Sequence, residues 1–153
     1  MKQIQTSITN RKIGFVEYDT SKNWIKDFPI QNWCLLIIAN EMQPNYFDEI
    51  IRKAIDKNVT YICAIGEHHE FIHDLADEEI VFRSIVLEKQ HLPTYTIITV
   101  GKNDFEEGLW FGLTCAFNDE VEIKETIILD LTKSIYKQTI ELINKFEKGY
   151  LPK

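Results

Sequence analysis

The sequence predicts an α/β protein: a three-layer, Rossmann-like open sheet, mainly parallel, with a β-rich N-terminal extension. Four apolar, β-branched runs are each followed by a segment with helical periodicity, and they span residues 34–39, 59–65, 95–100 and 126–131. Such runs are typical of parallel strands that helices cover on both faces. With 153 residues, the chain is expected to form a single domain around one hydrophobic core.

The first helix is expected after Pro44, with Asn45 as its N-cap and Asp48 and Glu49 in its first turn. Asn58 is the expected stop before the next strand. The residues expected on the buried face of this helix are Phe47, Ile50, Ile51, Ala54 and Ile55.

The second helix is expected to start at residues 67–69 and to reach at least residue 79, whereas residues 80–87 could be helix or strand. Its expected buried face is centred on Phe71, Ile72, Leu75 and Glu79.

The third helix is expected to open at Asp104, with Glu107 able to reach back to this N-cap. Gly108, Gly112 and Ala116 recur every four residues, which indicates close packing on the sheet. A last helix is expected over residues 133–148, ending at Gly149. Its expected buried face comprises Ile135, Thr139, Leu142, Ile143 and Phe146.

Residues 11–19, before these repeating units, alternate as an edge strand does.

Composition narrows the classes of partner. The chain has 17 Lys and Arg against 24 Asp and Glu, a formal charge of −7, which disfavours nucleic acid and favours a basic protein partner. No cofactor is expected, because residues 39–44 lack the glycines of a dinucleotide-binding turn. No membrane partner is expected either, since no apolar run reaches about 20 residues, and the N-terminus lacks the apolar core of a signal peptide. The sequence therefore predicts a cytoplasmic protein, and it leaves the oligomeric state open.

Cys34, Cys63 and Cys115 are odd in number, and the first two fall in expected buried strands. Neither a disulfide nor a cysteine nucleophile is expected from them.

One short segment matches the H-E-x-x-H pattern, in which two histidines one helical turn apart hold zinc and the glutamate activates a water. In a zinc hydrolase of this kind, His69 and His73 are the metal ligands and Glu70 is the catalytic base. Glu79 or Glu88 is then the third ligand. The helical period turns both histidines toward solvent, and charged neighbours flank them, so this interpretation is the alternative rather than the leading one.

Acidic residues gather where the second and third helices begin. Residues 67–79 contain six carboxylates and no Lys or Arg. Sites in open parallel sheets lie at the carboxyl ends of strands, so these acids are expected either to form a docking surface or to be a solvated helix face. The expected partner-binding residues are Glu67, Glu70, Asp74, Asp77, Glu78, Asp104, Glu106 and Glu107.

Three segments carry a resemblance to a known family. They are the strand end at Gly66, the acidic stretch over residues 73–78, and residues 106–111 leading into residues 115–117. On these segments, residues 33–119 resemble an uncharacterised bacterial family of small acidic α/β proteins. The resemblance implies the fold and a bacterial origin, and it transfers no activity. Its shared part begins at His73, which implies that His69 is incidental.

The leading functional prediction is a small acidic binding module: a bacterial immunity protein or antitoxin that neutralises a cognate toxin by direct binding. Small size, acidity and the lack of a catalytic turn favour this class, because many bacterial toxins are basic nucleases. The alternatives are the zinc-dependent hydrolase and an oligomeric nucleotide-sensing or scaffold domain.

Overall fold

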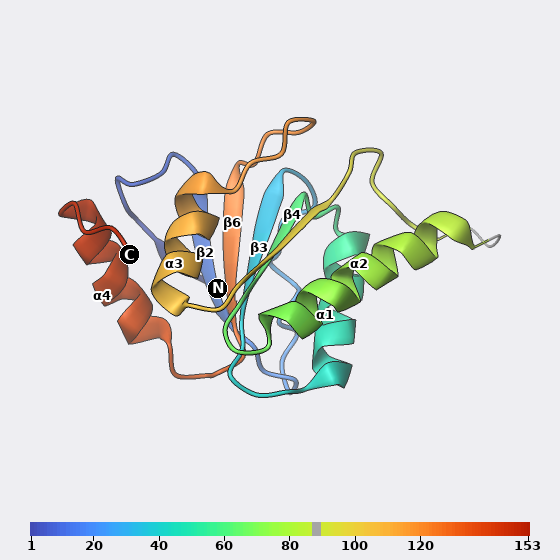
Figure 1. Ribbon diagram of the computed structural model, residues 1–153, viewed down its shortest axis with the longest axis horizontal. Coiled ribbons are helices and arrows are strands. Elements are labelled where there is room, and N and C mark those ends of the chain that lie inside the picture. Colours follow the sequence, from blue (N-terminus) through green and yellow to red (C-terminus); the bar gives the residue numbers. More distant parts are fainter. Residues whose placement is uncertain (87–89) are drawn as a thin grey trace.

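The computed structural model describes residues 1–86 and 90–153, so Leu87 and Glu88 lie outside the described residues. A six-stranded sheet stands between two layers of helices (Figure 1). The strands are β1 (Lys2–Ile4), β2 (Lys12–Glu17), β3 (Trp33–Ile38), β4 (Tyr61–Ile65), β5 (Ile98–Lys102) and β6 (Glu125–Asp130). The helices are α1 (Pro44–Asp56), α2 (His69–Ile85), α3 (Phe105–Trp110), which a π-helical turn over Phe111–Cys115 continues, and α4 (Tyr136–Glu147).

The sheet has the order β1-β2-β6-β3-β4-β5, and only its first pair, β1 with β2, is antiparallel. The expected mainly parallel α/β sheet is confirmed. The prediction of an edge strand at residues 11–19 is wrong in its position, because β2 lies between β1 and β6. This second pairing is parallel and aligns Lys12 with Glu125.

The third expected run, residues 95–100, enters the sheet later than predicted. Regular pairing with β4 begins at Ile98, whose N–H donates to the Thr60 carbonyl at 3.2 Å. The buried side chain of Asn118 joins the two segments just before this point by donating from Nδ2 to the carbonyls of Thr60 (3.0 Å) and Thr96 (2.9 Å).

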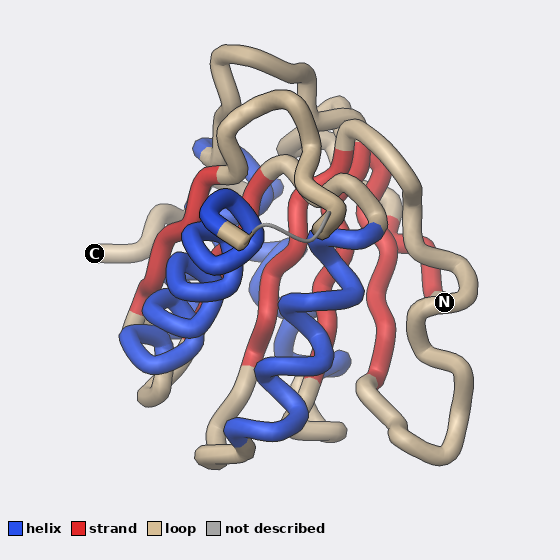
Figure 2. The backbone as a smooth tube through the Cα atoms, turned by 90° about the vertical axis from the view of Figure 1, so that its right-hand side faces the viewer, coloured by secondary structure: helices blue, strands red, loops and turns tan. Residues whose placement is uncertain are grey.

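The helices cover opposite faces of the sheet. α1 and α2 lie in front of the strands in Figure 2, and they pack on a core that includes Trp33, Leu35 and Ile62. α3 and α4 cover the other face, on a second core that includes Leu36 and Ile128. This arrangement gives the three layers that the sequence predicts.

α1 begins two positions earlier than predicted, because its N-cap is Gln43 and not Asn45. Pro44 is its first residue and Gln43 is the N-cap, a position that suits proline because the first helical N–H needs no partner. Asp48 and Glu49 consequently lie beyond the first turn. The five residues expected to be buried are all buried. Asn58, just after the end of the helix, turns the backbone toward β4 with a φ of 60°.

The start of α3 is as predicted, because the Asp104 carboxylate accepts a hydrogen bond from the Glu107 N–H at 2.9 Å. The glycines of this segment lie against the sheet. A Cβ atom at Gly108 would stand 2.8 Å from Ile65, and one at Gly112 would stand 2.4 Å from Leu36. Close packing is therefore the reason for both glycines.

α4 begins at residue 136, three residues after the expected start. The buried carboxylate of Asp130 holds the intervening turn by accepting from the N–H groups of Thr132 (2.8 Å), Lys133 (3.2 Å) and Ile135 (3.1 Å). The expected buried face of α4 is confirmed except that Ile135 is half-buried, and Gly149 ends the helix with a φ of 94°.

Candidate partner-binding surface

The chain leaves β4 at Gly66, just before α2. The φ of 121° at this glycine brings its backbone close to that of Ala39. The imidazole of His69 then donates from Nδ1 to the Gly66 carbonyl at 2.9 Å. This ring also lies against Gly101, where a Cβ atom would stand 2.7 Å from it. His69 is half-buried as a result, which differs from the expected turn toward solvent, and its contacts stabilise the first turn of α2.

The buried face of α2 is rotated from the predicted one. Ile72, Ala76 and Arg83 are buried, whereas Phe71 is 37% exposed. The predicted face ended at Glu79 and did not include Arg83, because a hydrophobic pattern alone does not place an arginine inside. The helix instead carries a charged group toward α1.

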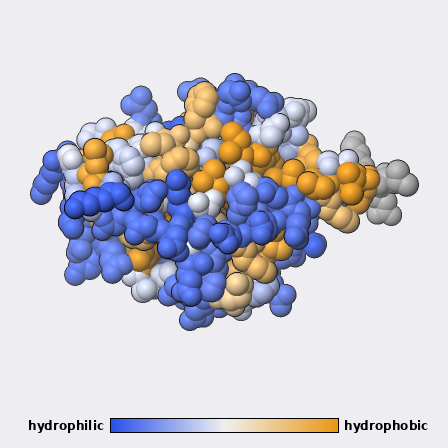
Figure 3. Space-filling view, in the orientation of Figure 1, coloured by the Kyte–Doolittle hydropathy of each residue, from blue (hydrophilic) through white to orange (hydrophobic). Residues whose placement is uncertain are grey.

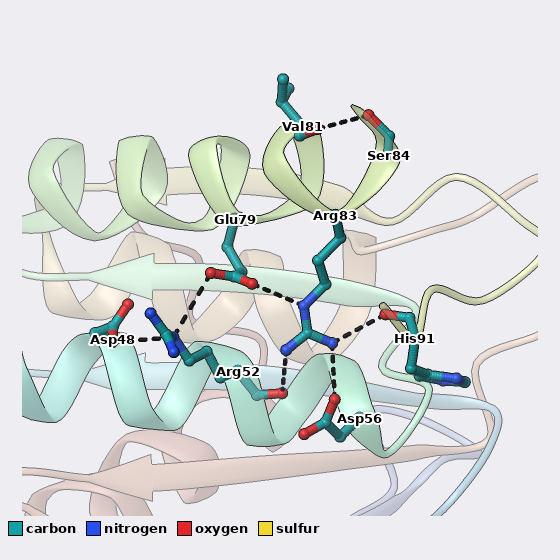
Figure 4. Close-up of polar contacts among 8 residues, drawn as sticks. All are labelled: Asp48, Arg52, Asp56, Glu79, Val81, Arg83, Ser84 and His91. Atoms are coloured by element: carbon teal, nitrogen blue, oxygen red, sulfur yellow. Dashed lines mark hydrogen bonds and ion pairs between the residues drawn. The ribbon is translucent and has the colours of Figure 1, made fainter. Parts of the chain in front are cut away.

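Arg83 lies at the centre of a polar network between α1 and α2 (Figure 4). Its guanidinium donates to Glu79 at 2.7 Å, to Asp56 at 2.7 Å and to the His91 carbonyl at 2.9 Å. Burial lowers the pKa of Arg83, but the hydrogen bonds with Glu79 and Asp56 outweigh it, so the net shift is upward. The network fixes α2 on α1 and holds the chain where it returns from the helix.

This network also separates Glu79 from the two histidines. The Glu79 carboxylate pairs with Arg83 and lies 3.6 Å from Arg52, on the side of α2 that faces α1. His73 lies instead near Asp74 (3.5 Å) and Asp77 (3.6 Å). Across residues 1–86 and 90–153, no group of three or more His, Cys, Asp or Glu could hold a metal ion. Glu88, the other candidate for a third ligand, lies outside the described residues.

Glu70, the base of the alternative hydrolase, lines a shallow pocket of about 420 Å³ with His69, His73, Asp74 and Gly101. Cys34 and Cys63 are buried, whereas Cys115 is exposed. Burial raises the pKa of Cys34 far above its ordinary value and that of Cys63 to about 12.

Of the eight expected partner-binding acids, four have contacts with residues other than their direct chain neighbours, and Asp74 also lies 3.5 Å from the adjacent His73. The carboxylate of Asp77 accepts from the Thr99 hydroxyl, and that of Asp104 caps α3. The others pair with residues on neighbouring elements: Glu106 accepts from the Tyr150 hydroxyl, and Glu107 lies 3.5 Å from Lys102. α3 and α2 lie on opposite faces of the sheet, so the expected acidic edge is divided between two surfaces.

The remaining acids, Glu67, Glu70, Asp74 and Glu78, are exposed. The last three lie on the side of α2 that faces away from the sheet. Arg83 is the only Lys or Arg in α2, whose residues are all described, and it is turned inward. The outward charge of this helix is therefore entirely acidic at neutral pH.

An apolar group at the end of α2 extends this acidic surface. Val81 is 56% exposed, Phe82 is 52% exposed and Ile85 is 71% exposed. Figure 3 shows the hydrophobic area that covers this projecting end of the molecule. We call the surface formed by these residues the α2 docking face: Glu70, Asp74, Glu78, Val81, Phe82 and Ile85.

Comparison with known proteins places the chain in a family. Residues 13–146 match the family model described as "Domain of unknown function (DUF7684)". The chain belongs to this family. No curated protein and no solved structure matches it.

The DUF7684 match begins in β2 and ends in α4, so it contains the whole α2 docking face. It also contains the region of the expected family resemblance, residues 33–119. In the described part of the chain, every helix is too short or too polar to cross a bilayer.

Proposed function

We propose that this DUF7684 protein is a binding module that docks to a basic protein through the α2 docking face. The observation that carries the proposal is the exposure of Val81, Phe82 and Ile85 at the projecting end of α2, next to acids of this helix, which is described in full and has no outward Lys or Arg. Large exposed apolar groups with polar surroundings are typical of protein interaction sites.

The two parts of the face have different physical roles. The three apolar side chains supply contact area that is desolvated on binding, and such anchors dominate the affinity of an interface. Glu70, Asp74 and Glu78 remain at its rim, where exposed charges mainly raise the association rate and select the partner. A partner that fits this face has apolar residues bordered by Lys or Arg.

A bacterial toxin whose active surface is basic is the partner class that this chemistry fits best. The chain would then be an immunity protein or antitoxin, acting in the cytoplasm by covering that surface. Its formal charge of −7 favours long-range attraction to such a target. No bound metal or cofactor is needed for this activity.

The test uses the product of the neighbouring upstream gene as the partner. In the first variant, Glu70, Asp74 and Glu78 are all changed to lysine. We expect association at low salt to be slowed by roughly 10- to 100-fold, with most of its salt dependence lost. A control variant with Asp27, Asp119 and Glu122 changed to lysine has the same net charge, and all three of these residues are exposed elsewhere on the surface.

A second variant, Phe82→Ala with Ile85→Ala, examines the apolar anchor. We expect faster dissociation with an association rate close to that of the wild type, because apolar contacts act after the encounter. Equal slowing by both lysine variants would mean that only the net charge matters, and it would contradict α2 as the docking site. Binding that neither the first lysine variant nor the alanine pair alters would refute the proposal.

A further inference from the structure

A second surface of the molecule lies where the connections of the sheet change sides. α1 follows β3 on one face, whereas α4 follows the neighbouring β6 on the other face. In open α/β sheets, the carboxyl ends of two strands that diverge in this way form a crevice where ligands bind. A pocket of about 410 Å³ lies at this point, within the range of small-molecule sites.

Two helix starts form the walls of this pocket. Phe105 begins α3 and Ile135 directly precedes α4, and both side chains are half-buried. Ile38 and Ile65, at the ends of their strands, provide the apolar floor. Figure 1 shows that the starts of α3 and α4 lie on the same side of the sheet. Both walls and the floor of the pocket are therefore apolar.

Polar side chains surround this apolar interior. Asn40, Glu67, Ser134 and Gln138 line the pocket, and all four are exposed. The two amides and the hydroxyl can both donate and accept hydrogen bonds, whereas an ionised carboxylate only accepts. The pocket can therefore form hydrogen bonds with a ligand that carries both donors and acceptors along one edge.

The charges of the pocket disfavour an anion. The N–H groups of the turn before α4, which would bind a phosphate, already donate to the buried Asp130 carboxylate. Glu67 adds a second negative charge at the pocket. These two negative charges would repel a phosphate or a carboxylate.

We infer that this pocket binds an uncharged, amino-substituted heterocycle: a nucleobase or nucleoside. Its ring lies between Phe105 and Ile135, and its amino group donates to Glu67. The amides of Asn40 and Gln138 pair with the donor and acceptor edge of the base, a geometry that both residue types use with adenine. This site is separate from the α2 docking face and does not depend on it.

The test is a titration of the ¹⁵N-labelled protein with adenosine, followed by backbone amide shifts. Saturable shifts are expected at Gly66, Thr132 and Ser134. Phe105→Leu should weaken binding about tenfold, because it removes base–aromatic stacking. Gln5→Ala is the matched control, since Gln5 is exposed on a distant part of the chain. A phosphorylated probe, AMP, should bind about fivefold more weakly than adenosine.

The variant Glu67→Gln removes the negative charge of this side chain and keeps its size and shape. This change should weaken adenosine binding and reduce the preference for adenosine over AMP, because it removes the repulsion of the phosphate. Tighter binding of AMP than of adenosine by the wild type would overturn the proposed ligand class. Shifts that do not saturate, or that are the same in Phe105→Leu and Gln5→Ala, would overturn the site itself.

Discussion

Arg83→Met removes the guanidinium at the centre of the network in Figure 4 and keeps an unbranched apolar stem. The Arg83 side chain is 5% exposed, and that of its partner Glu79 is 12% exposed. Breaking a buried pair by removing one member typically costs about 3–5 kcal/mol, because the other charge stays buried. Glu79 keeps a weaker contact with Arg52, at 3.6 Å, so we expect a loss of about 3 kcal/mol in the free energy of unfolding.

Urea unfolding at neutral pH measures this loss, and two further variants interpret it. Arg52→Met removes a cation that is 58% exposed, which should cost less than about 1 kcal/mol. The double variant Glu79→Leu with Arg83→Met replaces the pair with apolar groups and should recover most of the stability. If Arg83→Met cost no more than Arg52→Met, or if the double variant were less stable than Arg83→Met alone, the reasoning would be refuted.

Two further predictions concern the core. Gly112→Ala places a Cβ atom 2.4 Å from Leu36 and should cost about 1–3 kcal/mol in urea unfolding, and adding Leu36→Ala should cost less than the sum of the single changes. Burial, with repulsion from Glu49 and Tyr46, raises the pKa of Tyr18 from 10.0 to about 12. Above pH 10 the unfolded chain loses this proton first, so stability should fall as the pH rises through this window. Tyr18→Phe should make that fall shallower when unfolding is measured from pH 9 to 12, and the remaining fall comes from other tyrosines whose pKa is also raised, among them Tyr61 and Tyr95. At neutral pH the change should cost under about 1 kcal/mol, since the Tyr18 hydroxyl has no hydrogen-bond partner among the described residues. An unchanged pH dependence would contradict the assignment.

The parts of the fold that depend on local periodicity were predictable. The buried face of α1 follows from the spacing of its apolar residues, and the close packing of Gly108 and Gly112 follows from their presence inside a helix. Features that depend on distant residues were not predictable. One example is Asn118, which reaches from another loop to bond the carbonyls of Thr60 and Thr96 just before β5.

The candidate surface shows the same division. Its acids are visible in the sequence, but two of them have distant partners that the sequence does not reveal: Thr99 for Asp77 and Tyr150 for Glu106. Arg83 looks like an outward residue until its pairing with Asp56 on α1 is known. Once Arg83 is placed inside, Val81, Phe82 and Ile85 are outside by helical geometry. An odd charged residue within an apolar stretch was the one signal that could have indicated this.

The order of the strands has a consequence for how the chain is made. β6 lies between β2 and β3 and bonds to both, although it follows them by about a hundred residues in the sequence. Until residues 125–130 leave the ribosome, β2 and β3 each lack one of their two neighbours in the sheet, which is β6. Contacts between residues so far apart slow folding, because a long loop must close first. The first half of the chain therefore emerges with two apolar strand edges open, which makes aggregation during synthesis a specific risk for this topology.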